Sequence, residues 1–418
     1  MEQISTMDNK LTLIEKILSM KNVEGRHKQI CILGIKFKFK REYKNRHIYE
    51  KYPIQANKII FESCLGGYNC NPKYIVEEIL KRNLSYDIVW ITDQKTNKEG
   101  FPKGVRLVEK GSKEYYKDFA TAKIWIHNER IKKCVKKGLY KRPEQFYINT
   151  WHGSIGGKKC TIDRGTLDFA TLEPYIIEAE QVDYLISNSN YEDAFLKRMF
   201  WNNGKVLRYG HARNDIFFNI ALQEKSKSSI YSKFNIPQEH KLALYAPTFR
   251  DDKDISCYTL DYEVLKDSLK NRFGGEWTVL VRLHPQLYKI KDQFICDNSI
   301  INVTDHPDMQ ELLVLTDVLL TDYSSSVFDF MLTKKPAFIF ATDIDKYNNT
   351  RGLYDALTDT PFPVATSNEE LKKNILSFNN EKYQKDVMAF LTFKGCMDDG
   401  FASKRIVDLI ETLVNKEN

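Results

Sequence analysis

Hydroxyl side chains stand directly after an apolar run near residue 320, in a position that suits the binding of a phosphate. The run at 318–320 is followed by Asp322, then by Ser324 and Ser325, and an amphipathic segment begins at Val327. This order predicts a strand, a turn of small residues and the start of a helix. Helix starts carry unpaired N–H groups and the positive end of the helix dipole, so anions bind there readily. A serine that caps an ordinary helix is the alternative, and this stretch alone does not decide between the two.

Two more predicted strands in the same half of the chain end in cations. The run at 242–245 leads to Thr248 and Arg250, and the run at 277–281 leads to Arg282 and His284. Arginine can hold a phosphate through two parallel hydrogen bonds, and an adjacent histidine can add a hydrogen bond or a proton. With the serine turn, these residues suit the pyrophosphate of a nucleoside diphosphate. Neither a dinucleotide-binding glycine motif nor a P-loop occurs at these positions, which argues against those two kinds of site.

The first half of the chain offers a histidine at a strand end. The run at 146–148 is followed by His152 and Gly153, then by two glycines and Lys158. A histidine in such a turn can take a proton or contact a phosphate. A lone histidine is more often structural, but the neighbouring glycines and lysine favour a functional role. Farther on, Arg213 and Asp215 follow a short strand, and for Asp215 we favour a role in anchoring the loop between two domains.

Apolar runs and helical segments alternate along the chain. Continuous apolar runs are typical of strands buried on both faces of a parallel sheet, and helical patterns separate them. Two doubly wound α/β domains are therefore expected, spanning 51–222 and 230–418, with the polar stretch 223–229 as a linker. In open α/β sheets, ligands bind beyond the carboxyl ends of the strands, so we expect the chemistry in the cleft between the domains. The predicted strands lie at 59–61, 88–91, 124–126, 146–148, 184–186, 206–207, 242–245, 277–281, 318–320 and 337–340, and the helices at 72–82, 191–200, 262–271 and 309–315.

Composition limits the class of protein. A length of 418 residues suits two domains. The eight cysteines form no C-x-x-C pair, which argues against a disulfide framework or a metal site and is typical of a reducing cytosol. No apolar run reaches the ~18 residues of a membrane span, and the N-terminus lacks the apolar core of a signal peptide.

Residues 1–50 have the character of an appendage. Residues 11–20 predict a short amphipathic helix, and a basic segment at 36–46 interleaves cations with aromatic residues. Such a segment suits an anionic membrane surface better than nucleic acid, because no nucleic-acid motif accompanies it. An edge strand protected from aggregation by its lysines is the alternative. The cations are Lys36, Lys38, Lys40, Arg41, Lys44 and Arg46.

Five motifs, taken in order, resemble the CDP-glycerol glycerophosphotransferase family, which contains the teichoic acid primases and polymerases and related capsule enzymes. The resemblance extends from about Phe61 to a signature at 399–403. It implies a GT-B-like pair of Rossmann-type domains, a CDP-linked donor and loose attachment to the cytoplasmic face of a bacterial membrane. The motifs are Thr150-Trp151-His152-Gly153, Arg213-Asn214-Asp215, Tyr245-Ala246-Pro247-Thr248-Phe249-Arg250, Arg282-Leu283-His284-Pro285 and Thr321-Asp322-Tyr323-Ser324-Ser325.

The resemblance also assigns residues to roles. His152 and His284 match the two histidines treated as essential for transfer. The donor phosphates and nucleotide are expected at Arg282, Thr248, Arg250, Asp322, Ser324 and Ser325, with Lys158 and Arg213 on the acceptor side or at the hinge. The chain departs from the family after Trp-His-Gly, where the usual Thr-Pro-Leu-Lys is replaced by residues 154–158, and at 211–212, where His-Ala stands for Tyr-Pro. These departures leave the identity of the acceptor open.

The expected reaction is transfer of a polyol phosphate from CDP-glycerol, or alternatively CDP-ribitol, to a hydroxyl of a lipid-linked or polymeric acceptor, with release of CMP. His152 is the preferred base. No cofactor and no metal are expected, because no cluster of carboxylates demands one. A GT-B glycosyltransferase using a nucleotide sugar is one rival, and a non-catalytic polymer- or lipid-binding protein with a worn nucleotide fold is another.

Overall fold

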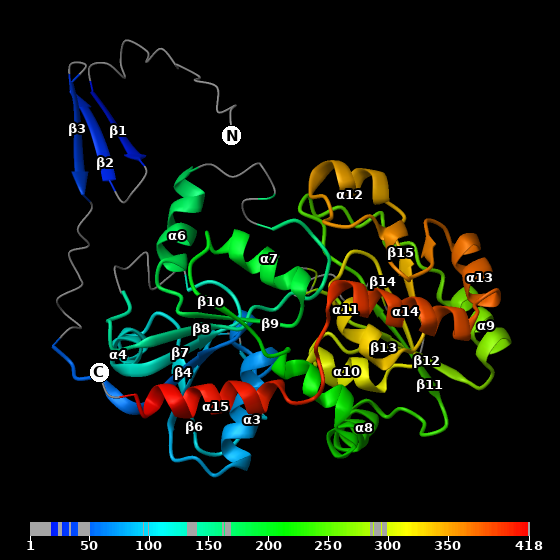
Figure 1. The fold of residues 1–418 in the computed structure, drawn as a ribbon. Helices are drawn as coiled ribbons and strands as arrows, with labels where there is room; N and C mark the ends of the chain where they lie inside the picture. Colours follow the sequence, from blue (N-terminus) through cyan, green and yellow to red (C-terminus); the bar gives the residue numbers. More distant parts are fainter. Residues whose placement is uncertain are drawn as a thin grey trace.

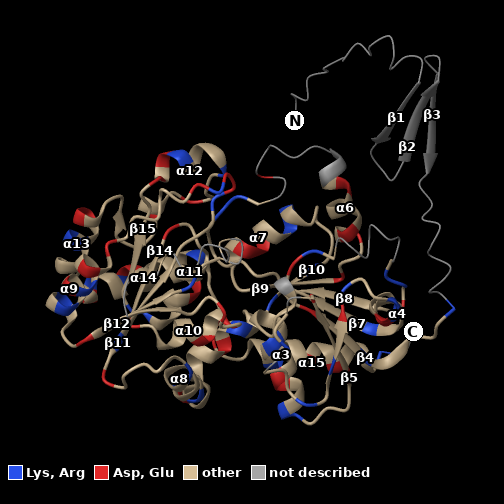
Figure 2. Cartoon of the chain, turned by 180° about the vertical axis from the view of Figure 1, so that it is seen from behind, with Lys and Arg blue, Asp and Glu red and all other residues tan. Residues whose placement is uncertain are grey.

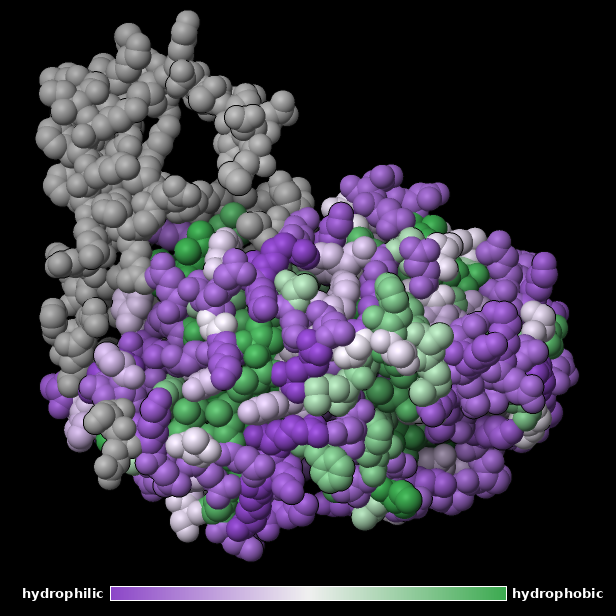
Figure 3. All heavy atoms as spheres, in the orientation of Figure 1, coloured by the Kyte–Doolittle hydropathy of each residue, from purple (hydrophilic) through white to green (hydrophobic). Residues whose placement is uncertain are grey.

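Two α/β domains lie side by side in the computed structural model, with a small separate sheet near the N-terminus (Figure 1). The structure describes residues 51–94, 96–98, 100–131, 140–160, 163, 169–284, 287, 294 and 299–416, together with the backbone of three strands between residues 18 and 40. Charged side chains lie mostly on helices and loops, while the strands of both large sheets carry few of them (Figure 2). The face in Figure 3 is largely hydrophilic, with its hydrophobic residues gathered toward the middle of the view.

The N-terminal domain is built on a seven-stranded parallel sheet in the order β10-β9-β8-β7-β4-β5-β6. Six of its strands contain a predicted apolar run, and β6 was not predicted. The inner strands are buried on both faces: β7 is buried over its whole length, and Trp90 and Trp125 are among the largest enclosed side chains. The strands are β4 (Gln55–Glu62), β5 (Asp87–Thr92), β6 (Val105–Glu109), β7 (Ala122–His127), β8 (Phe146–Asn149), β9 (Tyr184–Ser187) and β10 (Lys205–Arg208), and the helices are α3 (Cys70–Lys81), α4 (Lys113–Thr121), α6 (Phe169–Ala179) and α7 (Asn190–Met199), with the 3-10 turn η1 (Cys64–Gly66) after β4.

The C-terminal domain repeats this architecture with a six-stranded parallel sheet in the order β13-β12-β11-β14-β15-β16. The predicted strands at 242–245, 277–281, 318–320 and 337–340 are confirmed. The strands are β11 (Lys241–Ala246), β12 (Trp277–Val281), β13 (Ile300–Asn302), β14 (Val318–Thr321), β15 (Ala337–Phe340) and β16 (Val364–Ala365), and the helices are α9 (Tyr262–Phe273), α10 (Met309–Leu315), α11 (Ser326–Phe330), α12 (Ile344–Thr350), α13 (Asn368–Leu376) and α14 (Asn380–Lys394), with short 3-10 turns η5 (Met331–Thr333) and η6 (Leu357–Asp359).

The linker predicted at 223–229 is wrong, because these residues lie inside helix α8 (Ile220–Phe234). The Asn219 side chain caps the helix by accepting a hydrogen bond from the N–H of Leu222, and Asn235 closes it in the left-handed conformation. Ile230 and Tyr231 are buried, so the polar run forms the solvent side of the helix. Its lysine, glutamate and glutamine residues are good helix formers, and no glycine or proline interrupts them.

The chain crosses between the domains twice. The first crossing runs through the 3-10 helix η3 (Ala212–Phe218) into α8, and the second leads from α14 to α15 (Ala402–Val414), which returns to the N-terminal domain and packs on α3. Arg82 of α3 pairs with Asp408 and Glu411 of α15, at 2.7 Å each. Asp215 accepts hydrogen bonds from the first two N–H groups of α15, at 3.0 and 2.8 Å, which fits the anchoring role expected of it.

The appendage contains an antiparallel sheet of β1 (Leu18–Val23), β2 (His27–Ile32) and β3 (Ile35–Lys40), in that order. The basic segment is therefore a strand over 35–40, at the edge of this small sheet rather than of the first domain. The helix predicted at 11–20 is wrong at its end, because residues 18–20 pair in β1; residues 11–17 and 41–46 lie outside the described residues. Among the described helices, none has both the length and the apolarity needed to cross a membrane.

Candidate active site

The turn after β8 holds His152 in a fixed backbone frame. Trp151 has φ = +49°, a left-handed conformation that is rare for a residue with a bulky side chain. Its N–H donates to the side chain of Asn149 at 2.8 Å, and Asn71 donates to the carbonyls of both Thr150 and Trp151 at 3.0 Å. Because Asn71 is fully enclosed in α3, the turn is tied to a rigid element of the domain.

His152 presents one ring nitrogen as a base. Its Nδ1 lies 2.7 Å from the carbonyl oxygen of Asn128, so Nδ1 carries the proton and donates, which leaves the lone pair on Nε2. The side chain is exposed to solvent, yet the surrounding protein removes enough hydration to lower the pKa of His152. The positive charges of Arg213 and Lys158 lower this pKa further, while Glu129 opposes them. The imidazole is therefore neutral near pH 7 and able to accept a proton.

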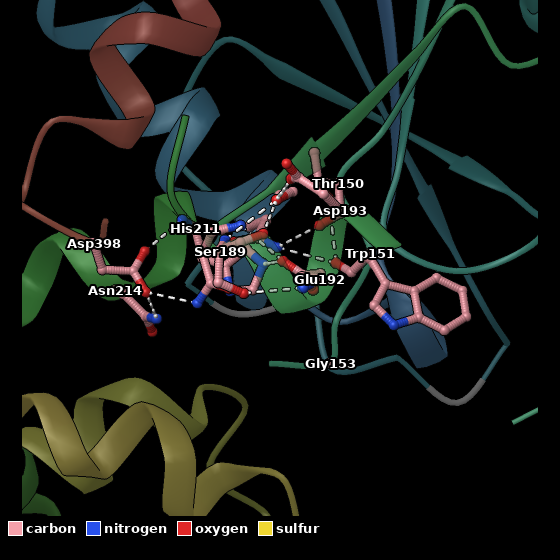
Figure 4. A network of polar contacts seen from close by, with 12 residues as sticks. Thr150, Trp151, Gly153, Ser189, Glu192, Asp193, His211, Asn214 and Asp398 are labelled. Carbon is pink, nitrogen blue, oxygen red and sulfur yellow. Dashed lines mark hydrogen bonds and ion pairs between the residues drawn. The ribbon is translucent and has the colours of Figure 1, made fainter. Parts of the chain in front are cut away.

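A buried polar network lies behind this turn (Figure 4). His211 and Glu192 are completely buried and their side chains lie 2.8 Å apart. Asp398, from the segment before α15, accepts hydrogen bonds from the His211 N–H at 2.7 Å and from Asn188 at 2.9 Å. The indole of Trp151 points away from this network in Figure 4. The histidine that replaces the usual tyrosine at position 211 thus has a structural partner inside the N-terminal domain.

Three basic side chains surround the ring of Phe249 at the opposite side of the cleft. The His284 ring lies 4.4 Å away between centroids, the Arg351 guanidinium 5.5 Å and the Lys158 ammonium 5.8 Å. Burial and then Arg351 lower the pKa of Lys158 to about 8, and burial followed by Lys158 and Arg351 lowers the pKa of His284 to about 4. Arg351 pairs with Asp251 at 3.0 Å, whereas within the described part of the chain no carboxylate lies within ion-pair distance of Lys158. Such an excess of positive charge suits a phosphate.

Lys158 reaches this side of the cleft on a loop that crosses from the N-terminal domain. Lys158 and Leu353 form an antiparallel bridge, and the N–H of Tyr354 donates to the carbonyl of Gly157 at 3.0 Å. The loop lies directly on α11: a Cβ added at Gly156 would meet the Phe328 ring at 2.5 Å, and one at Gly157 would lie 3.6 Å from Ser325. The placement of Lys158 therefore favours the donor side over the acceptor side or hinge.

Thr248, Arg250 and Asp322 are brought together, largely through bonds to the protein itself. Arg250 pairs with Asp322 at 2.9 Å and with Asp343 at 2.7 Å, and Asp322 accepts from the N–H of Thr248 at 2.8 Å. These contacts join the ends of β11 and β14. The hydroxyl of Thr248 is buried without a hydrogen-bond partner among the described residues, which leaves it available to a ligand.

Ser324 and Ser325 are half-buried beside the crossing loop. Ser324 lines a narrow crevice together with Gly157 and the apolar side chains of Leu353 and Phe362. The helix predicted after the serines is α11, but it has only five residues. A helix this short has little dipole, so the hydroxyls and local N–H groups would dominate any phosphate contact.

Arg282 and Arg213 occupy other places. Arg282 donates to the carbonyl oxygens of His306 and Pro307, at 2.5 and 3.4 Å, before α10, and burial lowers the pKa of Arg282 to about 10. These hydrogen bonds direct Arg282 to this loop rather than to the Phe249 cluster. Arg213 is buried between the domains and pairs with Asp329 at 2.9 Å.

Sequence reasoning missed Arg351, Asn71 and Asp329. Arg351 follows α12 rather than a strand, so the strand-end rule could not find it. Asn71 and Asp329 lie in helices, where a polar residue ordinarily faces solvent, and only the tertiary fold shows that they are buried. Within the described residues, no three histidine, cysteine, aspartate or glutamate side chains come together in a way that could hold a metal.

Comparisons with known proteins identify the family of this chain. Residues 45–412 match the family model described as CDP-Glycerol:Poly(glycerophosphate) glycerophosphotransferase. The chain belongs to this family. The resemblance drawn from the five motifs is thereby confirmed, and so is the GT-B-like fold, because the structure superposes on that of the wall teichoic acid polymerase TagF with a TM-score of 0.75 and 31% identity, covering 90% of this chain and 94% of that one.

Relatives of the family fall into two size classes. The teichoic acid poly(glycerol phosphate) polymerase of Staphylococcus epidermidis is 31% identical over 90% of this chain, but the match covers only 54% of that protein. The teichoic acid glycerol-phosphate transferase of Staphylococcus aureus is 30% identical over 85% of this chain and 92% of its own length. The chain thus spans about half the length of the longer polymerases. A Listeria monocytogenes protein solved as a UDP-N-acetylglucosamine 2-epimerase, at 13% identity and a TM-score of 0.51, shares the fold alone.

Proposed function

We propose that this protein transfers glycerol phosphate from CDP-glycerol to a hydroxyl group of a lipid-linked or polymeric acceptor and releases CMP. The observation that carries the proposal is that the neutral histidine base, His152, interacts electrostatically with Lys158, a member of the basic cluster that also contains His284 and Arg351. Membership of the family supports the same donor, and a histidine variant of the related TagF was solved after a soak with CDPG.

In the proposed reaction the acceptor oxygen attacks the phosphorus nearest the glycerol. Nε2 of His152 takes the proton from the acceptor hydroxyl as the new P–O bond forms, and the bond from that phosphorus to the oxygen shared with CMP breaks. CMP leaves with the bonding electron pair. Lys158 and Arg351 offset the charge that develops on the departing phosphate, and His284 adds a hydrogen bond. Phosphoryl transfer of this kind depends on positioning and electrostatics more than on covalent catalysis.

Glycerol is favoured over ribitol as the transferred polyol. The relatives named for glycerol phosphate reach 31% identity, whereas the poly(ribitol-phosphate) polymerase of Bacillus spizizenii is 27% identical over 87% of the chain. The difference is small, so CDP-ribitol belongs in any donor test. We expect Ser324, Ser325, Thr248 and Arg282 to contact the donor, with Arg250 and Asp322 shaping the site through their mutual ion pair.

We further propose that the protein works at the inner face of the bacterial membrane, where a lipid-linked acceptor would lie. The support is the strand β3, in which Lys36, Lys38 and Lys40 alternate with Phe37 and Phe39 at successive register positions. Alternating positions fall on opposite faces of a sheet, so one face can supply cations to anionic headgroups.

A donor screen tests the function. The protein is incubated with CDP-glycerol, CDP-ribitol and UDP-sugars in turn, with poly(glycerol phosphate) oligomers as acceptor, and CMP or UDP is measured. CMP release from CDP-glycerol that depends on the oligomer, and that is lost in His152→Ala, supports the proposal. Release of UDP alone would indicate a nucleotide-sugar glycosyltransferase, and no release with any donor would indicate a binding protein.

A further inference from the structure

Asp329 connects the donor side of the cleft to the histidine turn. It lies in α11, which begins immediately after Ser324 and Ser325, and its carboxylate is 4% exposed. The two oxygens accept hydrogen bonds from the Arg213 guanidinium at 2.9 and 3.2 Å, from Asn214 at 3.2 Å and from Gln310 at 2.9 Å. A buried carboxylate with this many donors is held in one position.

Arg213 continues the connection to the backbone around His152. One of its terminal nitrogens donates both to Asp329 and, at 2.5 Å, to the carbonyl oxygen of Gly153. The N–H of Arg213 donates to the side chain of Asn71 at 3.0 Å, and Asn71 in turn donates to the two carbonyls that precede His152. The peptide units on both sides of the histidine are therefore held by one buried chain of hydrogen bonds.

The donor turn is joined to the same chain a second time. The crossing loop of Gly156 and Gly157 begins three residues after Gly153 and lies against Phe328 of α11 and Ser325 directly before it. Helix α11 thus reaches the histidine loop at two places: Asp329 acts on Gly153 through Arg213, while Phe328 and Ser325 lie directly against Gly156 and Gly157. A shift of α11 would act on both contacts together.

We propose that Arg213 and Asp329 form a positioning pair that fixes the orientation of His152 relative to helix α11. The inference rests on the proposed function for its reaction. Neither residue touches the reacting atoms; both act through the backbone of the turn. The left-handed Trp151 makes such support necessary, because a strained backbone relaxes when its contacts are removed.

A second interdomain ion pair supplies a matched control. Lys73 of α3 pairs with Asp308 and Glu311 of α10, at 2.6 Å each, and so joins the same two domains. The hydrogen bonds of Lys73 go to these two carboxylates and not to the histidine turn. Glu311→Gln therefore weakens the interface without disturbing the proposed chain.

The effect of nearby charges on the titration of His152 distinguishes a positioning role of Asp329 and Arg213 from a purely stabilising one. Glu129, Arg213 and Lys158 act on the imidazole from three different segments. Neutralising Asp329 removes the negative charge that compensates Arg213, so the imidazolium form of His152 becomes harder to form. The acidic limb of the pH–activity profile therefore moves to lower pH. Arg213→Lys keeps the positive charge but loses the two-point fork, so it lowers turnover without moving the limb.

The experiment compares wild type, Asp329→Asn, Arg213→Lys and Glu311→Gln by turnover of CDP-glycerol against pH, by CDP-glycerol affinity in calorimetry and by thermal melting. For Asp329→Asn we expect a fall in kcat of about 10- to 100-fold, the range for a catalytic group displaced by about 1 Å, with donor affinity within about threefold of wild type. Arg213→Lys should lose a similar factor in kcat with an unmoved acidic limb. Glu311→Gln should keep the kcat and donor affinity of wild type, with a lower melting temperature because its ion pair with Lys73 is weakened.

An NMR titration of the His152 ring gives a readout that does not need turnover, with His152→Gln identifying the signal. A lower titration midpoint in Asp329→Asn supports the positioning pair even if wild type releases no CMP, an outcome that would defeat only the proposed function. The inference is overturned if Asp329→Asn retains wild-type kcat. It is also overturned if kcat, donor affinity and melting temperature fall together while the midpoint of His152 stays in place.

Discussion

The strongest test of the donor site is the pH dependence of CDP-glycerol binding, because it depends on one lysine. Burial and the charge of Arg351 lower the pKa of Lys158 to about 8 from the usual 10.5. A phosphate ligand binds the protonated form, so affinity is full below this pKa and is lost as pH rises through it. With a pKa of about 8, the protonated fraction falls from about 0.9 at pH 7 to about 0.1 at pH 9.

The apparent Kd should therefore rise about tenfold between pH 7 and pH 9, equivalent to about 1.4 kcal/mol. A lysine with the ordinary pKa would stay more than about 95% protonated, and the Kd would hardly change. His284, whose pKa is about 4, does not change its charge in this range, and Arg282, whose pKa is about 10, loses only about a tenth of its charge by pH 9. The slope of the apparent Kd against pH consequently reports on the protonation of Lys158.

Isothermal calorimetry with CDP-glycerol at pH 7, 8 and 9 measures the effect. Lys158→Met should weaken binding at pH 7 by about 10- to 150-fold, the usual value of a charge-assisted hydrogen bond, and should remove the slope. Lys159→Met is the matched control and should keep both affinity and slope, because the neighbouring lysine lies against Gly352 instead. A flat Kd in wild type, or a slope that survives in Lys158→Met, would refute the assignment of Lys158 to the donor phosphates.

Four further outcomes are expected. His152→Ala should lose about 10²- to 10⁴-fold in rate with an unchanged melting temperature, and near-normal activity of this variant would remove His152 from the mechanism. The wild-type rate should fall as pH drops below 6.5 through the lowered pKa of His152, since the base must be neutral. Arg282→Ala should weaken CDP-glycerol binding in calorimetry, and Arg282→Lys should also do so because it loses the planar contact; unchanged affinity would assign Arg282 to the loop before α10. Gly156→Ala should destabilise the protein by about 1–3 kcal/mol in thermal melts because Phe328 must move, and an unaltered melt would mean that the crossing loop adapts freely. Replacing Lys36, Lys38 and Lys40 of β3 with glutamine should lower the binding constant for anionic vesicles, measured by co-sedimentation, by about 100-fold. This follows from about 1 kcal/mol per charge, and the effect should be smaller at high salt. Equal sedimentation of the two proteins would indicate that the strand serves in packing instead.

Local patterns in the sequence were sufficient for most strands of the two large sheets and for the strand-end residues, but not for β6, β13 and β16. Apolar runs at 59–61 or 318–320 can be buried on both faces only in a covered parallel sheet, so strand and fold followed from the same observation. The polar run at 223–229 was misinterpreted because composition does not record which side of a helix faces solvent. Here the buried residues Ile230 and Tyr231 lie beyond the run, outside the window that suggested a linker.

The site was predictable where a residue follows a strand and not where the fold brings distant segments together. His152 and His284 were found from their positions after β8 and β12. Lys158 was expected on the acceptor side or at the hinge from its place in the first domain's sequence, whereas the Gly156–Gly157 loop brings it beside Phe249; its role in donor binding stays a prediction. Arg351 could not be found, because it follows α12 rather than a strand and only the tertiary fold places it beside Phe249.

The return of α15 to the first domain affects how members of this family can be recombined. A chimera of two family members with a single junction near residue 220 would combine the N-terminal sheet of one parent with helix α15 of the other. The contacts of Arg82 with Asp408 and Glu411 would then have to match between the parents. The C-terminal domain is in effect an insertion in the N-terminal domain, bounded by η3 at one end and by the segment before Ala402 at the other. A chimera that exchanges the C-terminal domain should therefore be cut at both boundaries, so that α3 keeps its own partner helix.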